Sequence, residues 1–433
     1  MTTSTPESIF PISNSPRVWL ISSADTPVGI SLLRRILAHG DFLVAGIDHQ
    51  AFESDSYKAK GFKEVLTEIG HYPARKDWQA RLKVVALDVR SQAQCQAAVA
   101  TAIHLFGKLD ILFCCTSQAI VGAVEELGCS TGTSLVREQF EMNFFGPMNM
   151  IKAVLPTMRS QHNGHVIVLT GITGHLGTPG LSMYCSSQWA LEGFCDSMAY
   201  EIAPFNVKLT IVQSSIEIGI LTNRVVSAPA MAEYTSEGGH QAPLFRGILD
   251  GLLNRLPGIR AQYPNAHAGA TPPGEDKERK PNGEDTSPTT NSEAERASGP
   301  FLLSRDETAS LIPPLSCAHA EKLVAETVHA ITAIGGHENP PARHIVGIEG
   351  VASVKEKLKT VSEELEEFVD ASVSVDCDRA GDKRPRRTSH ASQADSRGHA
   401  KTNGNGNGNG NGWDEPVDHV HPIHEAARVL QAL

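Results

Sequence analysis

The sequence predicts an α/β protein built on a doubly wound parallel sheet, and two observations support this prediction. Short β-branched apolar runs alternate with stretches of helical periodicity between Arg17 and Val212. The runs are apolar throughout instead of alternating with polar residues, as strands are when helices cover both faces of their sheet. Regular strand–helix alternation implies right-handed crossovers, which place helices on both faces.

The expected elements follow in chain order. Strands are predicted at residues 17–21, 42–47, 83–87, 110–114, 165–170 and 207–212. The helices between them are predicted at residues 28–39, 92–106, 136–160 and 184–203, the third broken at Gly146-Pro147. After Leu221 the regularity fades, and it resumes with a helix at 318–334, a short strand at 344–346 and a charged helix at 352–368. A short amphipathic helix is predicted at 424–433.

Three segments are too polar to form a core. Residues 1–16 are rich in Ser, Thr and Pro, residues 262–300 hold almost no large apolar side chain, and residues 403–412 repeat Asn-Gly. Such segments cannot offset their ordering entropy by burial. We therefore predict a disordered N-terminus at 1–16, one domain at 17–376 with a disordered insertion at 262–300, and a low-complexity tail at 377–433.

The composition excludes several classes of protein. The net charge of −11 argues against nucleic-acid binding by the whole chain, because phosphate backbones repel an acidic protein. We expect no signal peptide and no membrane span, since no stretch reaches about 18 apolar residues. The eight cysteines are scattered, as in a cytoplasmic protein with reduced thiols. His419, His421 and His424 lie beside the low-complexity repeat, and we predict no metal site.

Two stretches carry a resemblance to a known family. They are Gly174 to Phe205, GHLGTPGLSMYCSSQWALEGFCDSMAYEIAPF, and Pro340 to Leu358, PPARHIVGIEGVASVKEKL. Both resemble the short-chain dehydrogenase/reductase (SDR) family, especially members that act on retinoids, steroids and related lipids. The resemblance implies a Rossmann-type fold, NAD or NADP as the cofactor, a lipid-like small-molecule ligand, and a homo-oligomer. Family members usually pair through two long helices, which correspond here to residues 136–160 and 184–203.

The phosphate-binding loop of the family is degraded in this chain. Members carry Thr-Gly-x-x-x-Gly-x-Gly, whose glycines let the backbone approach the cofactor pyrophosphate at a helix N-terminus. Here the stretch runs from Ser22 to Gly29, and only Gly29 is retained as a candidate cofactor-binding residue. Ser23 and Pro27 take the other two glycine positions, and Asp25 adds a negative charge where the pyrophosphate would lie. Proline has no N–H to offer a phosphate.

An ordinary helix start explains the same residues. Asp25 or Thr26 can cap the helix, and Pro27 suits its first position. We adopt this interpretation, together with the hypothesis that the Asp25 carboxylate takes the place of the missing phosphate at the positive end of the helix.

Two aspartates are further candidate cofactor contacts. Asp48 follows the second strand, where a carboxylate favours NAD over the 2′-phosphate of NADP; a solvated turn residue is the alternative. Asp88 matches the family aspartate that contacts the adenine amino group, and it also suits an ordinary helix cap. The family's Asn-Asn-Ala-Gly is Cys114 to Ser117 here, which puts side chains in the path of the adenosine. We interpret the two cysteines as small apolar residues rather than as a redox pair.

Half of the family's catalytic set is retained. Tyr184 matches the tyrosine that exchanges a proton with the substrate oxygen, and Asn143 matches the asparagine that holds the water of the proton relay. The lysine that binds the ribose and lowers the tyrosine pKa is replaced by Gln188, a candidate ribose contact without a charge. The serine that hydrogen-bonds the substrate carbonyl is replaced by Gly171.

Other residues bear on the same site. Thr173 or Ser182 could substitute for the missing serine, whereas Thr170 faces the other side of its strand. Ser214-Ser215 replaces the Pro-Gly that lines the nicotinamide in the family.

Taken together, these changes predict an impaired SDR-like protein, a pseudoenzyme that works as a binding or regulatory module. The alternative is an atypical NAD(P)-dependent oxidoreductase that acts on a lipid-like or polyketide-like alcohol or ketone. A third hypothesis places function in the tail, where Lys383 to Arg387 resembles a nuclear-import patch, although such a run is also typical of a solvated surface.

Overall fold

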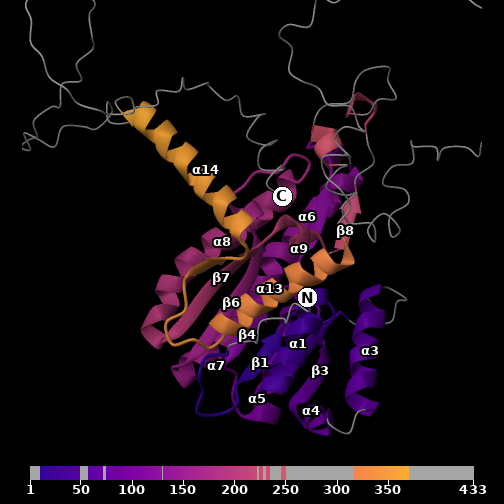
Figure 1. The fold of residues 1–433 in the computed structure, drawn as a ribbon, viewed down its shortest axis with the longest axis vertical. Coiled ribbons are helices and arrows are strands. Elements are labelled where there is room, and N and C mark those ends of the chain that lie inside the picture. The colour runs from indigo at the N-terminus through magenta and orange to yellow at the C-terminus, as the bar shows by residue number, and fades with distance from the viewer. Residues whose placement is uncertain are drawn as a thin grey trace, which may run out of the picture.

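A seven-stranded parallel sheet forms the centre of the protein in a computed structural model (Figure 1). The described residues are 10–48, 57–71, 75–128, 130–221, 224–227, 231–234, 245–249 and 316–369. The strand order is β3-β2-β1-β4-β6-β7-β9, and all neighbours pair in parallel. These strands are β1 Val18–Ile21, β2 Phe42–Ile47, β3 Leu82–Ala86, β4 Ile111–Cys114, β6 Gly164–Gly171, β7 Val207–Ser214 and β9 Arg343–Ile345. The order grows outward from β1 in both directions, which confirms the doubly wound α/β prediction.

Helices cover both faces of this sheet. One face carries α5 Gln92–Phe106, α7 Gly146–Gln161 and α8 Ser182–Ile202; the other carries α1 Pro27–His39, α3 Tyr57–His71 and α13 Cys317–Ile334. The remaining elements are α4 Lys76–Arg81, α6 Ser130–Phe140, a π-helical turn Glu141–Phe145, α9 Ile216–Leu221, α14 Ile348–Glu367, and 3₁₀ turns at Glu126–Gly128, Ile172–Gly174, Ala203–Phe205 and Ala232–Tyr234. Within the described ranges, no helix combines the length and apolar character needed to cross a bilayer.

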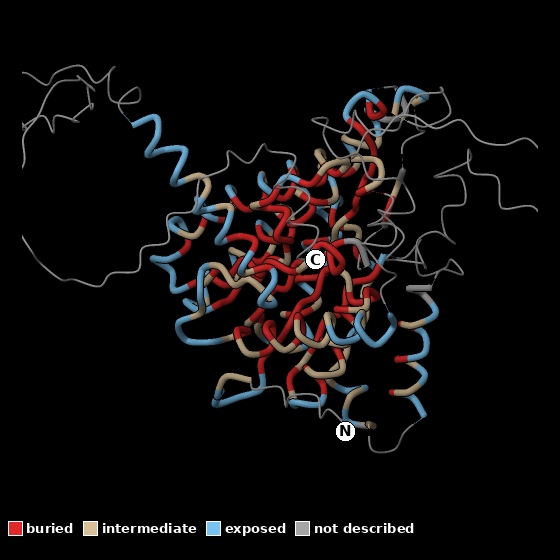
Figure 2. The backbone as a smooth tube through the Cα atoms, turned by 45° about the horizontal axis from the view of Figure 1, so that its top comes forward, coloured by how far each residue is buried: buried red, intermediate tan, exposed pale blue. Residues whose placement is uncertain are grey.

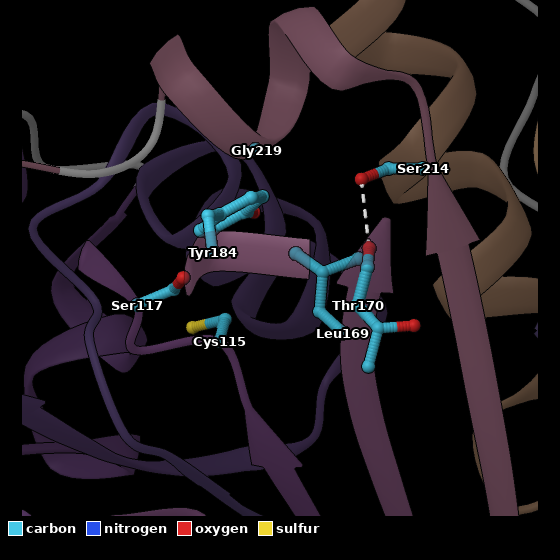
Figure 3. Close-up of a pocket in the computed structure, with 7 residues that line it drawn as sticks. All are labelled: Cys115, Ser117, Leu169, Thr170, Tyr184, Ser214 and Gly219. Atoms are coloured by element: carbon cyan, nitrogen blue, oxygen red, sulfur yellow. Dashed lines mark hydrogen bonds between the residues drawn. The ribbon is translucent and has the colours of Figure 1, made fainter. Parts of the chain in front are cut away.

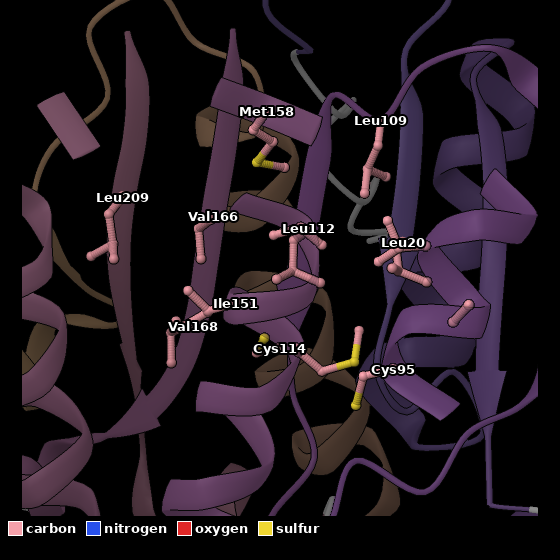
Figure 4. Close-up of a cluster of buried hydrophobic side chains, with 14 of the residues drawn as sticks. Leu20, Cys95, Leu109, Leu112, Cys114, Ile151, Met158, Val166, Val168 and Leu209 are labelled. Carbon is pink, nitrogen blue, oxygen red and sulfur yellow. The ribbon is translucent and has the colours of Figure 1, made fainter. Parts of the chain in front are cut away.

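The strand runs are apolar because each strand is buried on both sides. In β1, Val18 and Leu20 belong to the core beneath α5 and α7, whereas Trp19 and Ile21 belong to the core beneath α1 and α13. Successive side chains of a strand point to opposite faces, so a strand between two cores needs an apolar residue at every position. Figure 4 shows the first core, and Figure 2 shows buried residues concentrated in the interior of the molecule.

Most predicted elements lie at their expected residues, but the break predicted at Gly146-Pro147 is wrong. The helix continues through the π-helical turn into α7, whose first turn holds Pro147. Gly146 instead permits a close contact, because a Cβ there would lie 2.6 Å from Val89 Cγ2. Helices α3 and α4 are additional to the predicted elements, as is a small parallel sheet of β5 Gln118–Val121 and β8 Arg224–Ser227.

The segments predicted to be disordered lie mostly outside the described residues. This applies to 262–300 and to the tail from 377 onward, which includes the predicted helix at 424–433. At the N-terminus, residues 10–16 form neither helix nor strand, and Phe10 stacks on His39 with 4.0 Å between the ring centroids. The domain limits drawn from the sequence therefore stay predictions.

A chain of hydrogen bonds ties the start of β6 to the loop before β9. The Gly336 N–H donates to His165 Nδ1 at 3.1 Å, which leaves His165 Nε2–H to donate to the Thr210 hydroxyl at 3.0 Å. Thr210 in turn donates to the Pro341 carbonyl at 2.7 Å. Burial is the main cause that lowers the pKa of His165 to about 3. The ring is therefore neutral in the folded protein, as an acceptor at Nδ1 requires.

This histidine should make the folded state sensitive to acid. Its pKa is about 6.5 in an unfolded chain and about 3 when folded, so unfolding binds a proton between these values and stability falls as the pH drops below about 6.5. From pH 7 to pH 5 we expect His165 to account for a loss of about 2 kcal/mol. Denaturant titrations measure the difference in the free energy of unfolding between the unmodified protein and His165→Gln. This difference should be about 2 kcal/mol smaller at pH 5 than at pH 7. A difference of equal size at both pH values contradicts the prediction.

Candidate functional site

Tyr184 lies in the first turn of α8, close to the carboxyl ends of the central strands, and is 2% exposed. Its ring borders a cavity of about 10 Å³, which has room for about one water molecule. The residues that line this cavity are Cys115, Ser117, Leu169, Thr170, Tyr184, Ser214 and Gly219 (Figure 3). Asn143, Gly171 and Gln188 do not line this small cavity.

The phenol of Tyr184 is held in its protonated form. Burial raises the pKa of Tyr184 to about 12, and the neighbouring Ser117 hydroxyl offsets only part of this effect. Gln188, one helical turn further along α8, is also buried, and its neutral amide brings no positive charge that could lower the pKa. Tyr184 can donate a hydrogen bond at neutral pH, but it is a poor proton acceptor.

Asn143 bridges two elements from its position in the π-helical turn. Its carboxamide accepts a hydrogen bond from Gln118 N at 2.7 Å and donates to Gln118 O at 2.8 Å. It also donates to Ser187 Oγ at 3.0 Å. The side chain thus fixes the start of β5 to α8. π-Helical turns are frequent at functional sites, and here the turn aims an asparagine at the backbone of β5.

Gly171, at the end of β6, occupies the position of the family's serine. A Cβ on Gly171 would lie 3.0 Å from Thr173 Oγ1, so the Thr173 hydroxyl stands beside the place of the missing one. The hydroxyls of Thr173 and Ser182 are buried and have no hydrogen-bond partner among the described residues. Thr170 donates its hydroxyl proton to Glu192 Oε1 at 2.8 Å, so it does not replace the missing serine as a donor. Thr173 is therefore a candidate hydrogen-bond donor at the serine position.

The loop before α1 is built as a helix cap. Thr26 Oγ1 accepts from Gly29 N at 3.0 Å, so of the two expected caps it is Thr26 that serves. The Asp25 carboxylate accepts from Ser23 Oγ at 2.9 Å, and both Asp25 and Thr26 are buried. A Cβ on Gly29 would collide with the Ser23 carbonyl oxygen. Gly29 is therefore required for close packing of the loop on its own helix.

Ser22 links this loop to the one that follows β4. Its Oγ accepts from Cys115 N at 2.9 Å, from Thr116 N at 3.2 Å and from Thr116 Oγ1 at 2.8 Å. Cys114 and Cys115 form no disulfide and pack in the two cores, and burial raises the pKa of the Cys114 thiol. Both cysteines act as small apolar residues. The hydrogen bonds of Ser22 join the loop before α1 to the loop after β4, in the region where the family's adenosine would pass.

Helix α9 covers one side of Tyr184 (Figure 3). Ser215 Oγ accepts from Ile218 N at 3.4 Å, so α9 is capped immediately after β7. Ile218 then enters the buried core that also holds Ala24 of the loop before α1. Gly219 lies so close to the phenol that a Cβ on it would be 2.6 Å from Tyr184 Oη. Ser214-Ser215, which replaces the family's Pro-Gly, is thus followed directly by α9. This helix packs over the carboxyl edge of the sheet.

Part of the stretch after α9 is described, including residues 245–249. Leu249 lies in the buried cluster that contains Tyr184. Arg246 pairs with the buried carboxylate of Glu126, which also accepts from Ala123 N at 2.6 Å. The side of Tyr184 that this stretch covers is therefore apolar, and a buried ion pair holds the stretch in place.

The two aspartates expected to contact a cofactor interact with an arginine. Asp88 accepts from Arg90 Nε at 2.9 Å and from Arg90 N at 3.0 Å. Partial burial raises the pKa of Asp88, but the hydrogen bonds and charge of Arg90 outweigh it and hold the pKa below its usual value. Asp88, and more weakly Asp48 at the end of β2, raise the pKa of Arg90. Asp88 thus binds one surface guanidinium directly, and Asp48 acts on it only through a weaker electrostatic attraction.

These contacts do not fit an extended dinucleotide. A pyrophosphate at the start of α1 would have to displace the Thr26 cap and would meet the Asp25 carboxylate. On the α9 side of Tyr184, even a Cβ on Gly219 would lie 2.6 Å from the phenol oxygen, which leaves no space for a ring between them. The arrangement can bind one small polar molecule next to a phenol, which is far less than a cofactor requires.

Glu192 is a buried carboxylate behind the site that the sequence reasoning missed. It lies one helical turn after Gln188, is 4% exposed, and accepts from Gln213 Nε2 at 2.8 Å and from Arg343 at 3.1 Å. A Cβ on Gly174 would collide with this carboxylate. The available signal was an acidic residue on the same helical face as Tyr184 and Gln188.

The chain is similar to known short-chain dehydrogenases, and a model of that family matches residues 54–222. The oxidoreductase BOA17 of Botryotinia fuckeliana is 28% identical over 197 residues, 46% of this chain and 64% of that protein. The 3-ketodihydrosphingosine reductase of Bacteroides thetaiotaomicron is 33% identical over 170 residues (38% and 62%), and human retinol dehydrogenase 8 is 29% identical over 170 residues (39% and 51%). A crystal structure of a short-chain dehydrogenase from Streptomyces avermitilis has a TM-score of 0.54 at 20% identity, covering 84% of this chain and 100% of that one.

The similarity is confined to part of each sequence. This chain spans about half to two thirds of the length of these curated relatives. The matched range contains Asn143, Gly171, Tyr184 and Gln188, but it begins after the loop that ends at Gly29. The match to the family model thus covers β3 to β7 and the Tyr184 helix but not the phosphate loop.

The contact between α9 and Tyr184 can be measured by paired substitutions. Gly219→Ala places a methyl group 2.6 Å from the Tyr184 oxygen, and we expect it to lower the free energy of unfolding by about 1–3 kcal/mol. Tyr184→Phe removes that oxygen, so Gly219→Ala should cost less in that background. Gly193→Ala, in the middle of α8 with no atom near its Cβ position, is the matched control. If denaturant titration gives Gly219→Ala the same cost in both backgrounds, the two groups are not in contact.

Proposed function

Because the chain belongs to the short-chain dehydrogenase/reductase family, we propose that it is a member whose cofactor cleft is closed by its own residues and which works as a binding or regulatory module. One observation carries this proposal: Gly219 of α9 lies against the Tyr184 phenol, in the space that a nicotinamide needs. The capped loop before α1 supports it, since Gly29 N already donates to Thr26.

The composition of the proton relay supports the same proposal. Without an ammonium at Gln188 the Tyr184 phenol keeps its proton, and without a hydroxyl at Gly171 a substrate oxygen lacks one donor. Loss of a proton-transfer partner costs about 10²–10⁴ in rate. Loss of one donor to a developing charge costs about 10²–10³. The two factors need not multiply, because such residues act as a unit, but either alone leaves only slow turnover.

A second candidate is an atypical oxidoreductase that acts on a lipid-like or polyketide-like alcohol or ketone. The buried Thr173 hydroxyl favours it, because this donor lacks a partner among the described residues and stands beside the position of the missing serine. The relatives named as a sphingolipid-type reductase and a retinol dehydrogenase suggest the substrate class. This reading requires α9 to move away from Tyr184 before a cofactor binds.

We also propose a homo-oligomer that pairs through α7 and α8, as is usual in the family. Trp189 and Tyr200 on α8 are 53% and 84% exposed, and aromatic side chains are enriched at protein interfaces. The net charge of −11 favours a lipid-like ligand or a protein partner over nucleic acid. A cytoplasmic location is proposed, with nuclear import through Lys383 to Arg387 as the alternative; that run lies outside the described residues.

Isothermal titration with NAD and NADP tests the closed cleft. We expect dissociation constants weaker than about 1 mM for both cofactors. The double variant Gln188→Lys/Gly171→Ser restores the family's catalytic residues but leaves α9 and the Thr26 cap in place, so it should bind no better. Micromolar binding of either cofactor by the unmodified protein would overturn the proposal.

A turnover assay separates the two candidate functions. Retinol with NAD and 3-ketodihydrosphingosine with NADPH are suitable probes, because relatives carry these compounds in their names. We expect no cofactor-dependent turnover above that of Tyr184→Phe, since the buried phenol with its pKa near 12 has no lysine beside it. Turnover that disappears in both Tyr184→Phe and Thr173→Val would establish the oxidoreductase instead.

A further inference from the structure

Helix α14 leaves the body of the protein after its first two turns. Figures 1 and 2 show it as a projecting rod whose outer part is exposed. At its root, Ser353 and Val354 are buried. Beyond Val354 the helix exposes large apolar side chains, with Leu358 at 58% and Leu365 at 65% exposed. A solvated helix has no need of leucines at such positions, so this face is suited to contact another surface.

The apolar residues of α14 follow a heptad repeat. They are spaced by three and four residues in turn, at Val351, Val354, Leu358, Val361, Leu365 and Phe368. Spacings of three and four place side chains along one narrow stripe, which is the seam of a coiled coil rather than the wider face of a helix packed on a globular core. Val354 packs into the body, Val351 is partly buried, and Leu358, Val361 and Leu365 continue the seam outward. We call these three residues the α14 ridge.

The charges beside the ridge are separated along the helix. Residues 355–359 hold three lysines and Glu356, a net charge of +2, and residues 363–367 hold four glutamates, a net charge of −4. Two such helices side by side in parallel would place lysines against lysines and glutamates against glutamates. In the antiparallel orientation, the basic half of each lies against the acidic half of the other, while the ridges still meet. The helix is therefore complementary to a second copy of itself in one orientation.

We propose that α14 is a self-association surface through which two copies of this chain pair in antiparallel orientation. The ridge supplies apolar burial, and the separated charges select both the partner and its direction. Two heptads alone form a marginal coiled coil, so the pairing depends on protein concentration. This surface is separate from α8 and from the Tyr184 site, and the inference does not rest on the proposed function.

Sedimentation equilibrium of the full chain tests the ridge. Leu365→Glu puts a carboxylate into the seam, and we expect it to halve the molar mass at concentrations where the unmodified protein is associated. Ala352→Glu adds the same charge to an exposed position of α14 away from the ridge and should leave the mass unchanged. The halving is expected whether or not α8 pairs the molecule as well. Equal masses for the unmodified protein and Leu365→Glu at every concentration overturn the proposal.

A charge exchange tests the antiparallel direction. Lys357→Glu/Lys359→Glu gives residues 355–359 a net charge of −2, so both halves of the outer helix are acidic and association should be abolished. Adding Glu363→Lys/Glu364→Lys/Glu366→Lys to that variant gives residues 363–367 a net charge of +2, which reverses both halves, keeps the spacing of the 359–363 ion pair, and should restore the original mass. Raised salt should weaken association of the unmodified protein. Failure of the fivefold exchange to restore association, or association that strengthens with salt, excludes the antiparallel pair.

Discussion

The start of α9 at the end of β7 is the constraint on which the site depends. The Ser215 hydroxyl accepts from Ile218 N and begins the helix with no intervening loop. The helix therefore turns back over the carboxyl edge of the sheet, where open α/β proteins bind their ligands. Ile218 enters one core and Gly219 meets the Tyr184 phenol, so the edge is closed by packing rather than by a single obstructing side chain.

The loops on the other side of the cleft are closed by their own hydrogen bonds. Ser22 accepts from backbone donors after β4, and Thr26 accepts from Gly29 N at the start of α1. Each such bond contributes about 0.5–1.5 kcal/mol, and an entering phosphate would have to replace them. It would also bring negative charge up to the buried Asp25 carboxylate. The donors that the family uses for a pyrophosphate serve the fold here, so the replacements of Ser23 and Pro27 belong to one consistent local structure.

The fold could be predicted from local pattern, whereas much of the site could not. Apolar runs such as Val18–Ile21 and the periodicity of α8 locate the sheet and the Tyr184 helix directly. The choice of Thr26 over Asp25 as the cap depends on backbone angles that both residues can adopt in principle. Glu192 escaped prediction because its partners Gln213 and Arg343 come from β7 and β9, which only the folded sheet brings to α8. Gly146 was misread because its close neighbour, Val89, comes from another part of the chain.

The Tyr184 site and the root of α14 are parts of one packed unit. Val354 at the root of α14 lies in the same buried cluster as Tyr184 and Leu249. A Cβ on Gly350 would lie 3.2 Å from both Ile172 and Ile345, so the root of the helix is seated closely on the end of β6 and on β9. Interiors packed at this density transmit displacement instead of absorbing it. Any movement of α9 or of residues 245–249 that opened space beside Tyr184 would therefore disturb the cluster in which the root of α14 is seated, whereas the α14 ridge lies beyond that cluster.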